Sequence, residues 1–288
     1  MNATASGPVN VRTVTRVTRG QAASDGAGVR LTRIIGGPGL PQVDPFLLLD
    51  EFRSDTPGDY IGGFPDHPHR GFETVTYMLA GRMRHADNQG NAGLLTPGSV
   101  QWMTAGRGLI HSEMPEQEDG LLWGFQLWVN LPAADKMTAP RYQDIAPDAI
   151  PEVTIADDVV VRVLAGSVAG VTGPVSGIAT RPVYLDIHLP AGASTALPLA
   201  GDLSAFCYLY AGSASVGQAA ASRVLDRGEL GLLGPGDTFC AAALNQPARL
   251  ILVAGLALHE PIARYGPFVM NTREEIIAAV EDFNAGRF

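Results

Sequence analysis

Apolar and polar residues alternate along much of this chain, in short runs that recur at intervals of roughly ten residues. Glycine, proline and aspartate separate the runs, and these are residues that tight turns favour. Alternation with a period of two is typical of a β-strand with one buried face. The pattern predicts a β-sandwich or β-barrel, with its clearest strands at residues 72–79, 93–103, 125–131, 184–189, 206–210 and 250–256.

One amphipathic helix is predicted, and it is the last element of the chain. Thr272 and Glu275 have the spacing of a capping box, in which each side chain bonds to the other residue's backbone. The apolar residues that follow recur every three or four positions and form one stripe: Ile276, Ile277, Val280 and Phe283. Gly286 can end the helix, and we expect its apolar stripe to pack on a sheet.

Two short segments of the chain occur twice, in the same order. Residues 75–81 (VTYMLAG) are matched by residues 206–212 (FCYLYAG). Residues 93–98 (GLLTPG) are matched by residues 231–236 (GLLGPG). A supersecondary unit that repeats in this way indicates a duplicated β domain.

The chain is long enough for two domains of this kind. It has 288 residues, of which 46% are hydrophobic, enough to form a sizeable core in each half. Four prolines interrupt a strand-poor stretch at residues 132–152, which is typical of a domain boundary. We therefore expect an N-terminal domain at residues 1–140 and a C-terminal domain, ending in the helix, at residues 141–288.

Charge and cysteine content exclude several classes of protein. The net charge is −9, so direct binding to nucleic acid through its phosphates is not expected. Cys207 and Cys240 are the only cysteines, which excludes a disulfide scaffold and a cysteine-based zinc site. The first residues lack the apolar run of a signal peptide, and glycines break the uncharged stretch at residues 163–180. The sequence therefore predicts a cytoplasmic protein without a membrane span.

Two pairs of metal-ligand residues stand in the first half of this histidine-poor chain. His67 and His69 lie in the run DHPHR, and His111 and Glu113 lie in the run HSE. Residues i and i+2 of a strand point to the same face, so each pair presents two ligand groups on one side. If the strands are neighbours, three imidazoles and one carboxylate converge inside a barrel. Such a set leaves two positions open on an octahedral ion, which favours Fe(II) or a related redox metal over a closed zinc site.

Other polar residues near these pairs are expected to have different roles. Glu73 has the parity of His67 and His69, so an unbroken strand would direct it toward the same ion. We interpret Glu73 as an outer-sphere group or reserve ligand, and Arg70 as a surface residue. The remaining histidines are expected to be structural: His85 in a polar turn, His188 on a strand and His259 near a proline.

The second copy of the repeat lacks these ligands. The offsets between the repeated segments place Pro198, Ala200 and Arg249 opposite the three histidines. None of these residues can replace an imidazole as a ligand. The C-terminal domain is therefore predicted to bind no metal.

Longer segments of the chain resemble one known family. Residues 62–76 (GGFPDHPHRGFETVT) resemble the first metal motif of the cupin superfamily, in the form found in pirins. Residues 102–115 (WMTAGRGLIHSEMP) resemble the second pirin motif. Residues 124–132 (GFQLWVNLP) and 266–276 (GPFVMNTREEI) are similar to pirin segments as well. The resemblance spans nearly the whole chain and is weakest at residues 153–179.

The resemblance implies an all-β bicupin, with two face-to-face antiparallel β-barrels of jelly-roll type, a C-terminal helix and one mononuclear iron in the N-terminal barrel. Its metal ligands map onto His67, His69, His111 and Glu113. The chain departs from the general cupin pattern at Ile61, where a glycine is usual, and in the spacing between Glu73 and Gly81. The ending His-x-Glu of the second motif is a third departure. It is pirin-like and moves the carboxylate ligand from Glu73 to Glu113.

The resemblance implies two kinds of function. Some pirins resemble quercetinases, which open the flavonol ring of quercetin with dioxygen and release carbon monoxide. The first expectation is thus a dioxygenase that uses Fe(II), or another first-row divalent metal, and in which Glu113 accepts the flavonol proton. Phe64, Trp102 and Trp128 are candidates to line its pocket. Other pirins are described as redox-sensitive cofactors of transcription regulators or as partners of metabolic enzymes, so the alternative is a non-enzymatic iron sensor that binds a protein.

Overall fold

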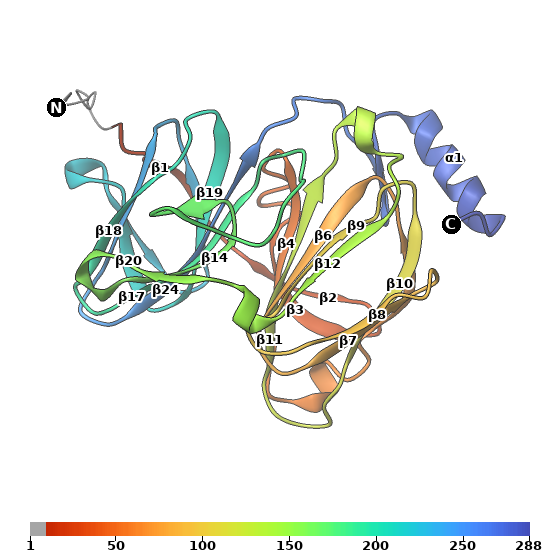
Figure 1. Cartoon of the computed structure of the whole chain (residues 1–288), viewed down its shortest axis with the longest axis horizontal. Helices are drawn as coiled ribbons and strands as arrows, with labels where there is room; N and C mark the ends of the chain where they lie inside the picture. The colour runs from red at the N-terminus through yellow and green to blue at the C-terminus, as the bar shows by residue number, and fades with distance from the viewer. Residues whose placement is uncertain (1–9) are drawn as a thin grey trace. The chain divides into compact units, whose positions relative to one another are not determined.

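A computed structural model describes residues 10–288, which form two compact β units (Figure 1). One unit comprises residues 20–150, 177–180 and 257–288, and we call it the histidine-bearing unit because it contains the predicted histidine ligands. The second unit comprises the described residues 10–19 together with residues 151–176 and 181–256. Each unit contains one seven-stranded and one four-stranded sheet, and the strand pairs within these sheets are antiparallel. The predicted all-β class is confirmed.

The histidine-bearing unit contains the strands that hold the predicted ligands. Its larger sheet consists, in spatial order, of β12 (Arg141–Ile145), β9 (Val100–Thr104), β6 (Phe72–Ala80), β11 (Leu122–Asn130), β4 (Phe46–Ser54), β3 (Val29–Ile35) and β2 (Gln21–Asp25). Its smaller sheet consists of β5 (Phe64–His69), β10 (Leu109–Pro115), β7 (Met83–Asp87) and β8 (Ala92–Leu95). A two-stranded sheet of β25 (Ala263–Tyr265) and β26 (Phe268–Met270) precedes helix α1 (Arg273–Asn284). Single 3₁₀ turns lie at Pro57–Asp59, Ala133–Asp135 and Pro147–Ala149.

The second unit has the same plan. Its larger sheet consists of β1 (Val14–Arg19), β22 (Glu229–Leu233), β19 (Leu203–Ala211), β24 (Ala248–Leu256), β17 (Val183–Leu189), β14 (Val160–Ala165) and β13 (Glu152–Thr154). Its smaller sheet consists of β18 (Ser194–Pro198), β23 (Thr238–Ala243), β20 (Ser213–Val216) and β21 (Arg223–Asp226). A short hairpin joins β15 (Ser167–Val168) to β16 (Val171–Thr172), and 3₁₀ turns lie at Ala156–Asp158 and Ala219–Ala221.

The two strand orders correspond position by position, which agrees with the predicted duplication. Residues 75–81 and 206–212 belong to β6 and β19, which occupy equivalent places. The second matched pair is not equivalent, because residues 93–98 include the end of β8 whereas residues 231–236 include the end of β22, the counterpart of β9. The second copy of this segment therefore lies on the counterpart of the next strand, β9, and not on the counterpart of β8. The sequence offset taken from this matched pair was wrong for aligning the two units.

The compact units are interleaved along the chain, whereas the predicted domains are contiguous. Strand β1 pairs with β22 and so belongs to the second unit, and β12 takes the corresponding edge position in the histidine-bearing unit. Residues 257–288, with helix α1, return to the histidine-bearing unit. Backbone pairing at sheet edges accounts for the two strands, since β1 pairs with β22 far along the chain and β12 pairs back with β9 across the predicted boundary at residue 140.

Helix α1 has the predicted capping box. Thr272 Oγ1 accepts a hydrogen bond from the Glu275 backbone at 3.2 Å, and the Glu275 carboxylate accepts one from the Thr272 backbone at 2.8 Å. Ile276 packs with Phe268 of β26 in one apolar cluster, while Ile277 is exposed. The apolar stripe is thus narrower than predicted, and it packs on the small β25–β26 sheet.

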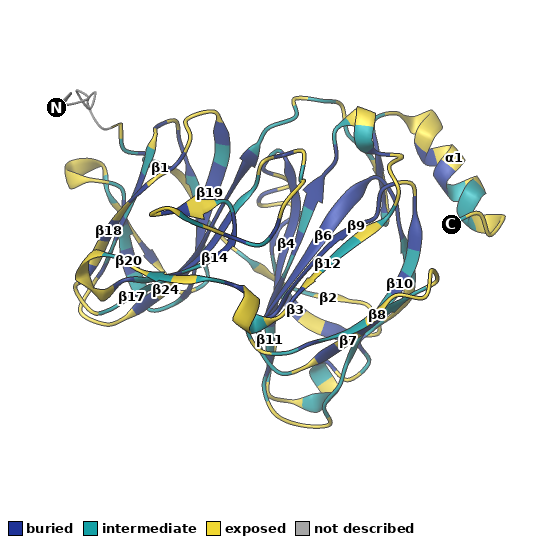
Figure 2. Cartoon of the chain, viewed as in Figure 1, coloured by how far each residue is buried: buried dark blue, intermediate teal, exposed yellow. Residues whose placement is uncertain are grey.

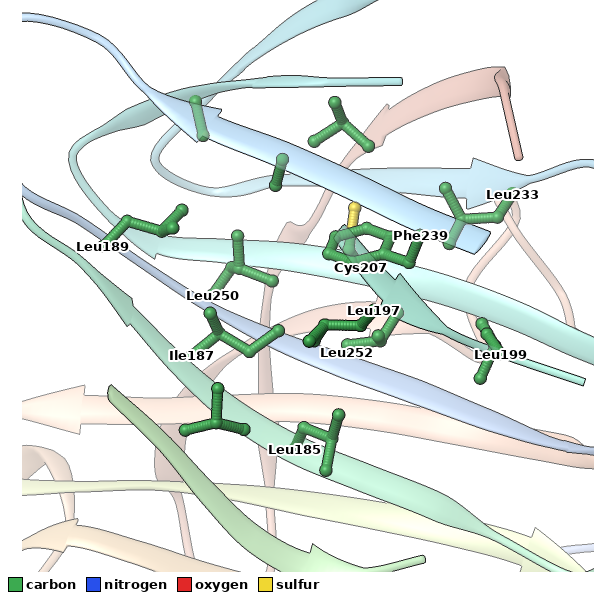
Figure 3. Close-up of a cluster of buried hydrophobic side chains, with 14 of the residues drawn as sticks. Leu185, Ile187, Leu189, Leu197, Leu199, Cys207, Leu233, Phe239, Leu250 and Leu252 are labelled. Atoms are coloured by element: carbon green, nitrogen blue, oxygen red, sulfur yellow. The ribbon is translucent and has the colours of Figure 1, made fainter. Parts of the chain in front are cut away.

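Both units bury apolar side chains between their sheets, and the central strands are the most buried parts of the chain (Figure 2). In the second unit, Leu185, Leu197, Phe239 and Leu252 form part of one continuous core (Figure 3). Cys207 lies in this core as a free thiol, and Cys240 is also free.

The strands equivalent to β5 and β10 carry no comparable set of ligands in the second unit. His111 pairs with His67 across β10 and β5, whereas the corresponding strands β23 and β18 pair Ala241 with Thr195 and Phe239 with Leu197. The side chains on the buried face of these two strands are Thr195, Leu197, Phe239, Ala241 and Ala243. They include none of the residues obtained from the sequence offsets, and none of them is a strong metal ligand. The absence of metal from this unit stays a prediction, and it now rests on these residues instead of those obtained from the offsets.

Candidate metal centre

The three predicted histidine ligands come together on neighbouring strands of the smaller sheet. His67 and His69 occupy alternate positions of β5, and His111 lies directly opposite His67 on β10. One ring nitrogen from each histidine lies within 4.8 Å of the others. The Nε2 atoms of His67 and His69 are 3.0 Å apart, and the His67 and His111 ring centroids are 4.4 Å apart. This part of the predicted ligand set therefore forms one cluster.

Burial keeps two of these imidazoles, His69 and His111, in the form that binds metal. His69 is 3% exposed and His111 is fully buried. Burial lowers the pKa of both side chains well below the usual value, and the neighbouring imidazoles lower it further. Neither ring nitrogen of His111 has a hydrogen-bond partner among residues 10–288. A neutral imidazole with an unpaired nitrogen is the ligand that first-row divalent metals prefer, so the cluster fits such an ion.

Glu113 lies beside this cluster, on the same strand as His111. Its side chain is 3% exposed, and one carboxylate oxygen accepts a hydrogen bond from the Thr76 hydroxyl at 2.8 Å. Burial raises the pKa of Glu113, while His67, Thr76 and His85 act in the opposite direction. The group of ligand atoms within 4.8 Å consists of the three imidazoles without this carboxylate. The role of Glu113 as a fourth ligand thus stays a prediction.

Glu73 points away from the cluster, contrary to the interpretation drawn from its parity. Thr76 on the same strand contacts Glu113, and Phe72 packs 5.0 Å from the His69 ring, so the even-numbered residues of β6 face the histidines. Glu73 faces the other side, where it accepts a hydrogen bond from Thr104 at 2.7 Å. Odd-numbered residues face the cluster in β5 and even-numbered residues face it in β6, and the change occurs at Gly71, which separates the two strands.

Gly71 permits this break because of its backbone and its surroundings. Its φ is +88°, a conformation that favours glycine. A Cβ at this position would lie 2.0 Å from the carbonyl oxygen of Val269 in β26. Lys136, 1% exposed, donates from Nζ to the carbonyl oxygens of both Gly71 and Val269, at 2.8 and 3.0 Å. The turn after His69 is therefore tied to the C-terminal strand.

The expected surface position of Arg70 and the expected turn position of His85 were both wrong, because each side chain pairs with a carboxylate distant in sequence. Arg70 is 4% exposed, because it forms an ion pair with Asp282 of α1 at 2.8 Å and lies 4.2 Å from the ring centroid of Phe288. His85 lies on β7 rather than in a turn, is 1% exposed and bonds to the Asp144 carboxylate at 3.0 Å.

A cavity of about 350 Å³ opens next to the histidines, within the volume range of small-molecule sites. His67, His69 and Glu113 contribute to its wall, together with the predicted Phe64 and Trp128. Trp102 does not line it, because Trp102 pairs with Val75 and so shares the Glu73 face of the sheet.

Sequence reasoning missed several residues of the cavity wall. Gln126 of β11 gave no signal of its own, although its alternation with Trp128 places both on one face. Arg264 and Pro267 come from the C-terminal segment, about 150 residues beyond the second metal motif. Their place depends on the return of that segment to the histidine-bearing unit. No helix in residues 10–288 is both long and apolar enough to span a membrane.

Comparison with known proteins identifies the family. The Pirin profile matches residues 28–129, and the profile of the Pirin C-terminal cupin domain matches residues 184–288. The chain is 50% identical over 279 residues to a pirin-like protein of Caulobacter vibrioides, covering 96% of this chain and 99% of that protein. It is also 50% identical to a Pseudomonas aeruginosa protein whose name provisionally assigns it as a quercetin 2,3-dioxygenase, with 96% and 97% coverage.

A solved structure has the same fold. The crystal structure of quercetin 2,3-dioxygenase from Acinetobacter baumannii superposes with a TM-score of 0.88 at 32% identity, covering 96% of this chain and 98% of that one. The sequence profiles, the relatives and the fold agree with the resemblance of the two metal motifs. The chain belongs to the pirin family and has its two-domain cupin fold.

Proposed function

We propose that this protein is an Fe(II)-dependent dioxygenase that opens a flavonol ring of the quercetin type with O2 and releases carbon monoxide. One observation carries the proposal: three imidazoles, two of them buried, converge beside a cavity whose wall contains His67, His69, a carboxylate and aromatic side chains. Similarity to proteins named as quercetin 2,3-dioxygenases supports the choice of reaction. The cytoplasm is the proposed location.

The ligand residues would have distinct tasks. His67, His69 and His111 would hold the ion as neutral donors, and Glu113 would add a negative charge that compensates part of the ion's charge. When bound, the iron would supply Lewis acidity and an electron path between substrate and O2. The cavity beside these ligands would leave space for both reactants next to the ion.

Glu113 is the residue best placed to take the flavonol proton. Its carboxylate lines the cavity together with His67 and His69, where the hydroxyl of a bound flavonol would lie. The Thr76 hydroxyl, 2.8 Å away, fixes the orientation of that carboxylate. Phe64 and Trp128 would pack against the faces of a planar substrate and exclude water from the reacting ring.

The test is anaerobic loading with Fe(II), followed by quercetin and then air. We expect loss of the flavonol absorbance with release of one carbon monoxide per quercetin consumed, and one metal ion per chain. Alanine substitutions should each lower metal content sharply at three positions: His67, His69 and His111. His259→Gln is the matched control, because His259 is an exposed histidine of the same unit and should keep the metal.

Full metal occupancy without turnover, for Fe(II) and for the other first-row divalent ions, would refute the dioxygenase. That result, combined with capture of a protein partner that depends on the oxidation state of the iron, would favour the predicted non-enzymatic sensor. A second ion, lost on substitution in the second unit, would contradict the metal-free C-terminal domain.

A further inference from the structure

Arg264 of β25 places a positive charge in the wall of the cavity. Its guanidinium carbon lies 4.8 Å from the ring centroid of Trp128, which is a cation–π distance. The Trp128 ring is in turn 5.3 Å from the ring of His69. The guanidinium is thus separated from the histidine cluster by a single indole, so that one small aromatic molecule can reach both.

Apart from the Trp128 ring, the guanidinium of Arg264 has no direct partner within residues 10–288. Among residues 10–288, its guanidinium makes no hydrogen bond and no ion pair within 4.0 Å. The carboxylates closest to it electrostatically are Asp50 and Asp25. Arg33 already binds both oxygens of Asp50, at 3.0 and 2.8 Å, and one oxygen of Asp25, at 2.9 Å.

Arg33 therefore balances one of these two negative charges by direct contact, and the hydrogen-bond donors of Arg264 remain available. A guanidinium carries five N–H donors in a planar fork, which matches the two oxygens of a carboxylate. The rest of the wall includes the apolar side chains of Leu48, Phe52 and Phe64 beside the carboxylates of Asp25 and Asp50.

We propose that Arg264 binds a carboxylate of the substrate, so that the protein acts on planar aromatic molecules that carry an acidic group at the end remote from the metal. The inference rests on the proposed function only in taking the histidine cluster as the place where the other end of the substrate binds. It narrows the substrate class from neutral flavonols to aromatic acids. Arg264 is in this sense a specificity-determining residue.

Arg53 offers an internal comparison. Its guanidinium carbon lies 4.7 Å from the ring centroid of Trp123, nearly the same geometry as Arg264 over Trp128. Arg53 and Arg264 are both exposed, but only Arg264 lines the cavity. Both arginines thus stack on a tryptophan, but only Arg264 does so in the wall of the cavity beside the histidine cluster.

The experiment measures binding of two matched probes, 3-hydroxyflavone-4′-carboxylate and its 4′-carboxamide. Dissociation constants are obtained by calorimetry with metal-loaded and with metal-free protein, at low and high salt. We expect the wild-type protein to bind the carboxylate about tenfold more tightly than the carboxamide, as a charge-assisted hydrogen bond provides. The preference should shrink at high salt, because screening weakens the attraction.

Arg264→Gln should reduce this preference to about one, Arg264→Lys should keep part of it, and Arg53→Gln should leave it unchanged. Metal content, measured on every variant, verifies that the histidine cluster is intact. A wild-type protein without the preference, or an Arg264→Gln variant that keeps it, overturns the inference. A wild-type protein that prefers the carboxylate probe but opens no flavonol ring would instead refute the dioxygenase and leave Arg264 as an anion-binding residue. Failure of the inference and failure of the proposed function are therefore distinguishable.

Discussion

Glu73→Gln is the substitution that best separates the two buried carboxylates of the histidine-bearing unit. Glu73 is 2% exposed and accepts a hydrogen bond from Thr104. Burial is the main reason that its pKa is raised from 4.5 to about 7. Glutamine has nearly the same shape as protonated glutamate and carries no charge, so it reproduces the form that the folded protein prefers at low pH.

The magnitude and sign follow from linkage between protonation and folding. The folded state binds the proton more tightly than the unfolded state, so the contribution of Glu73 to stability is complete below pH 4.5. It is lost as the pH rises from 4.5 to about 7, and the full loss corresponds to about 3 kcal/mol. We therefore expect Glu73→Gln to be more stable than the wild type by less than about 1 kcal/mol at pH 5 and by up to about 3 kcal/mol at pH 8.

Urea unfolding of the metal-free protein between pH 5 and pH 8.5 measures this difference. Tryptophan fluorescence reports on the correct unit, because all three tryptophans of the chain lie in the histidine-bearing unit: Trp102, Trp123 and Trp128. Glu118→Gln is the control, since Glu118 is an exposed glutamate of the same unit. Metal content after loading should be unchanged in both variants.

Two results would refute the reasoning. A Glu73→Gln variant that is less stable than the wild type at pH 8 would mean that the charge of Glu73 is stabilised in the folded state. Loss of metal in Glu73→Gln, with retention in Glu113→Gln, would mean that the general cupin ligand set applies and that the pirin-type assignment is wrong.

Three further substitutions test other parts of the structure. Glu113→Gln should weaken metal binding and should lower ring-opening activity by more than the metal loss explains, as compared by activity per bound ion. Lys136→Met should lower the free energy of unfolding by about 2–4 kcal/mol, because three buried oxygen atoms at 2.8–3.0 Å lose their donor; a change below 1 kcal/mol in urea unfolding would contradict this. Thr272→Ala should lower stability by about 1 kcal/mol through loss of the helix cap, which thermal unfolding can detect, whereas Thr272→Ser should restore it.

The histidine cluster could be predicted because it depends on local geometry. Alternation within a strand places His67 and His69 on one face, and neighbouring strands of one sheet place His111 opposite His67. The helix cap is equally local, since Thr272 and Glu275 are three residues apart. Where the chemistry of a short segment determines its structure, pattern and structure agree.

The expectations that failed depend on contacts across long stretches of chain. Arg70 is buried because α1, more than 200 residues later, supplies Asp282. Arg264 reaches the cavity because the chain returns to the histidine-bearing unit after residue 256. Contacts between segments so far apart leave no periodic pattern in either segment. The sequence therefore indicates neither the buried ion pair of Arg70 nor the position of Arg264 in the cavity wall.

The assignment of the carboxylate shows why strand parity has to be counted only within an unbroken strand. Glu73 and Glu113 are both nearly fully buried, and burial raises the pKa of both, so neither property distinguishes a metal ligand from a structural acid. Orientation does distinguish them. Glu113 follows His111 by two residues on one strand, whereas Gly71 separates Glu73 from His69 and reverses the face to which it points. A single glycine with positive φ thus accounts for the carboxylate of β10, rather than that of β6, lying beside the imidazoles.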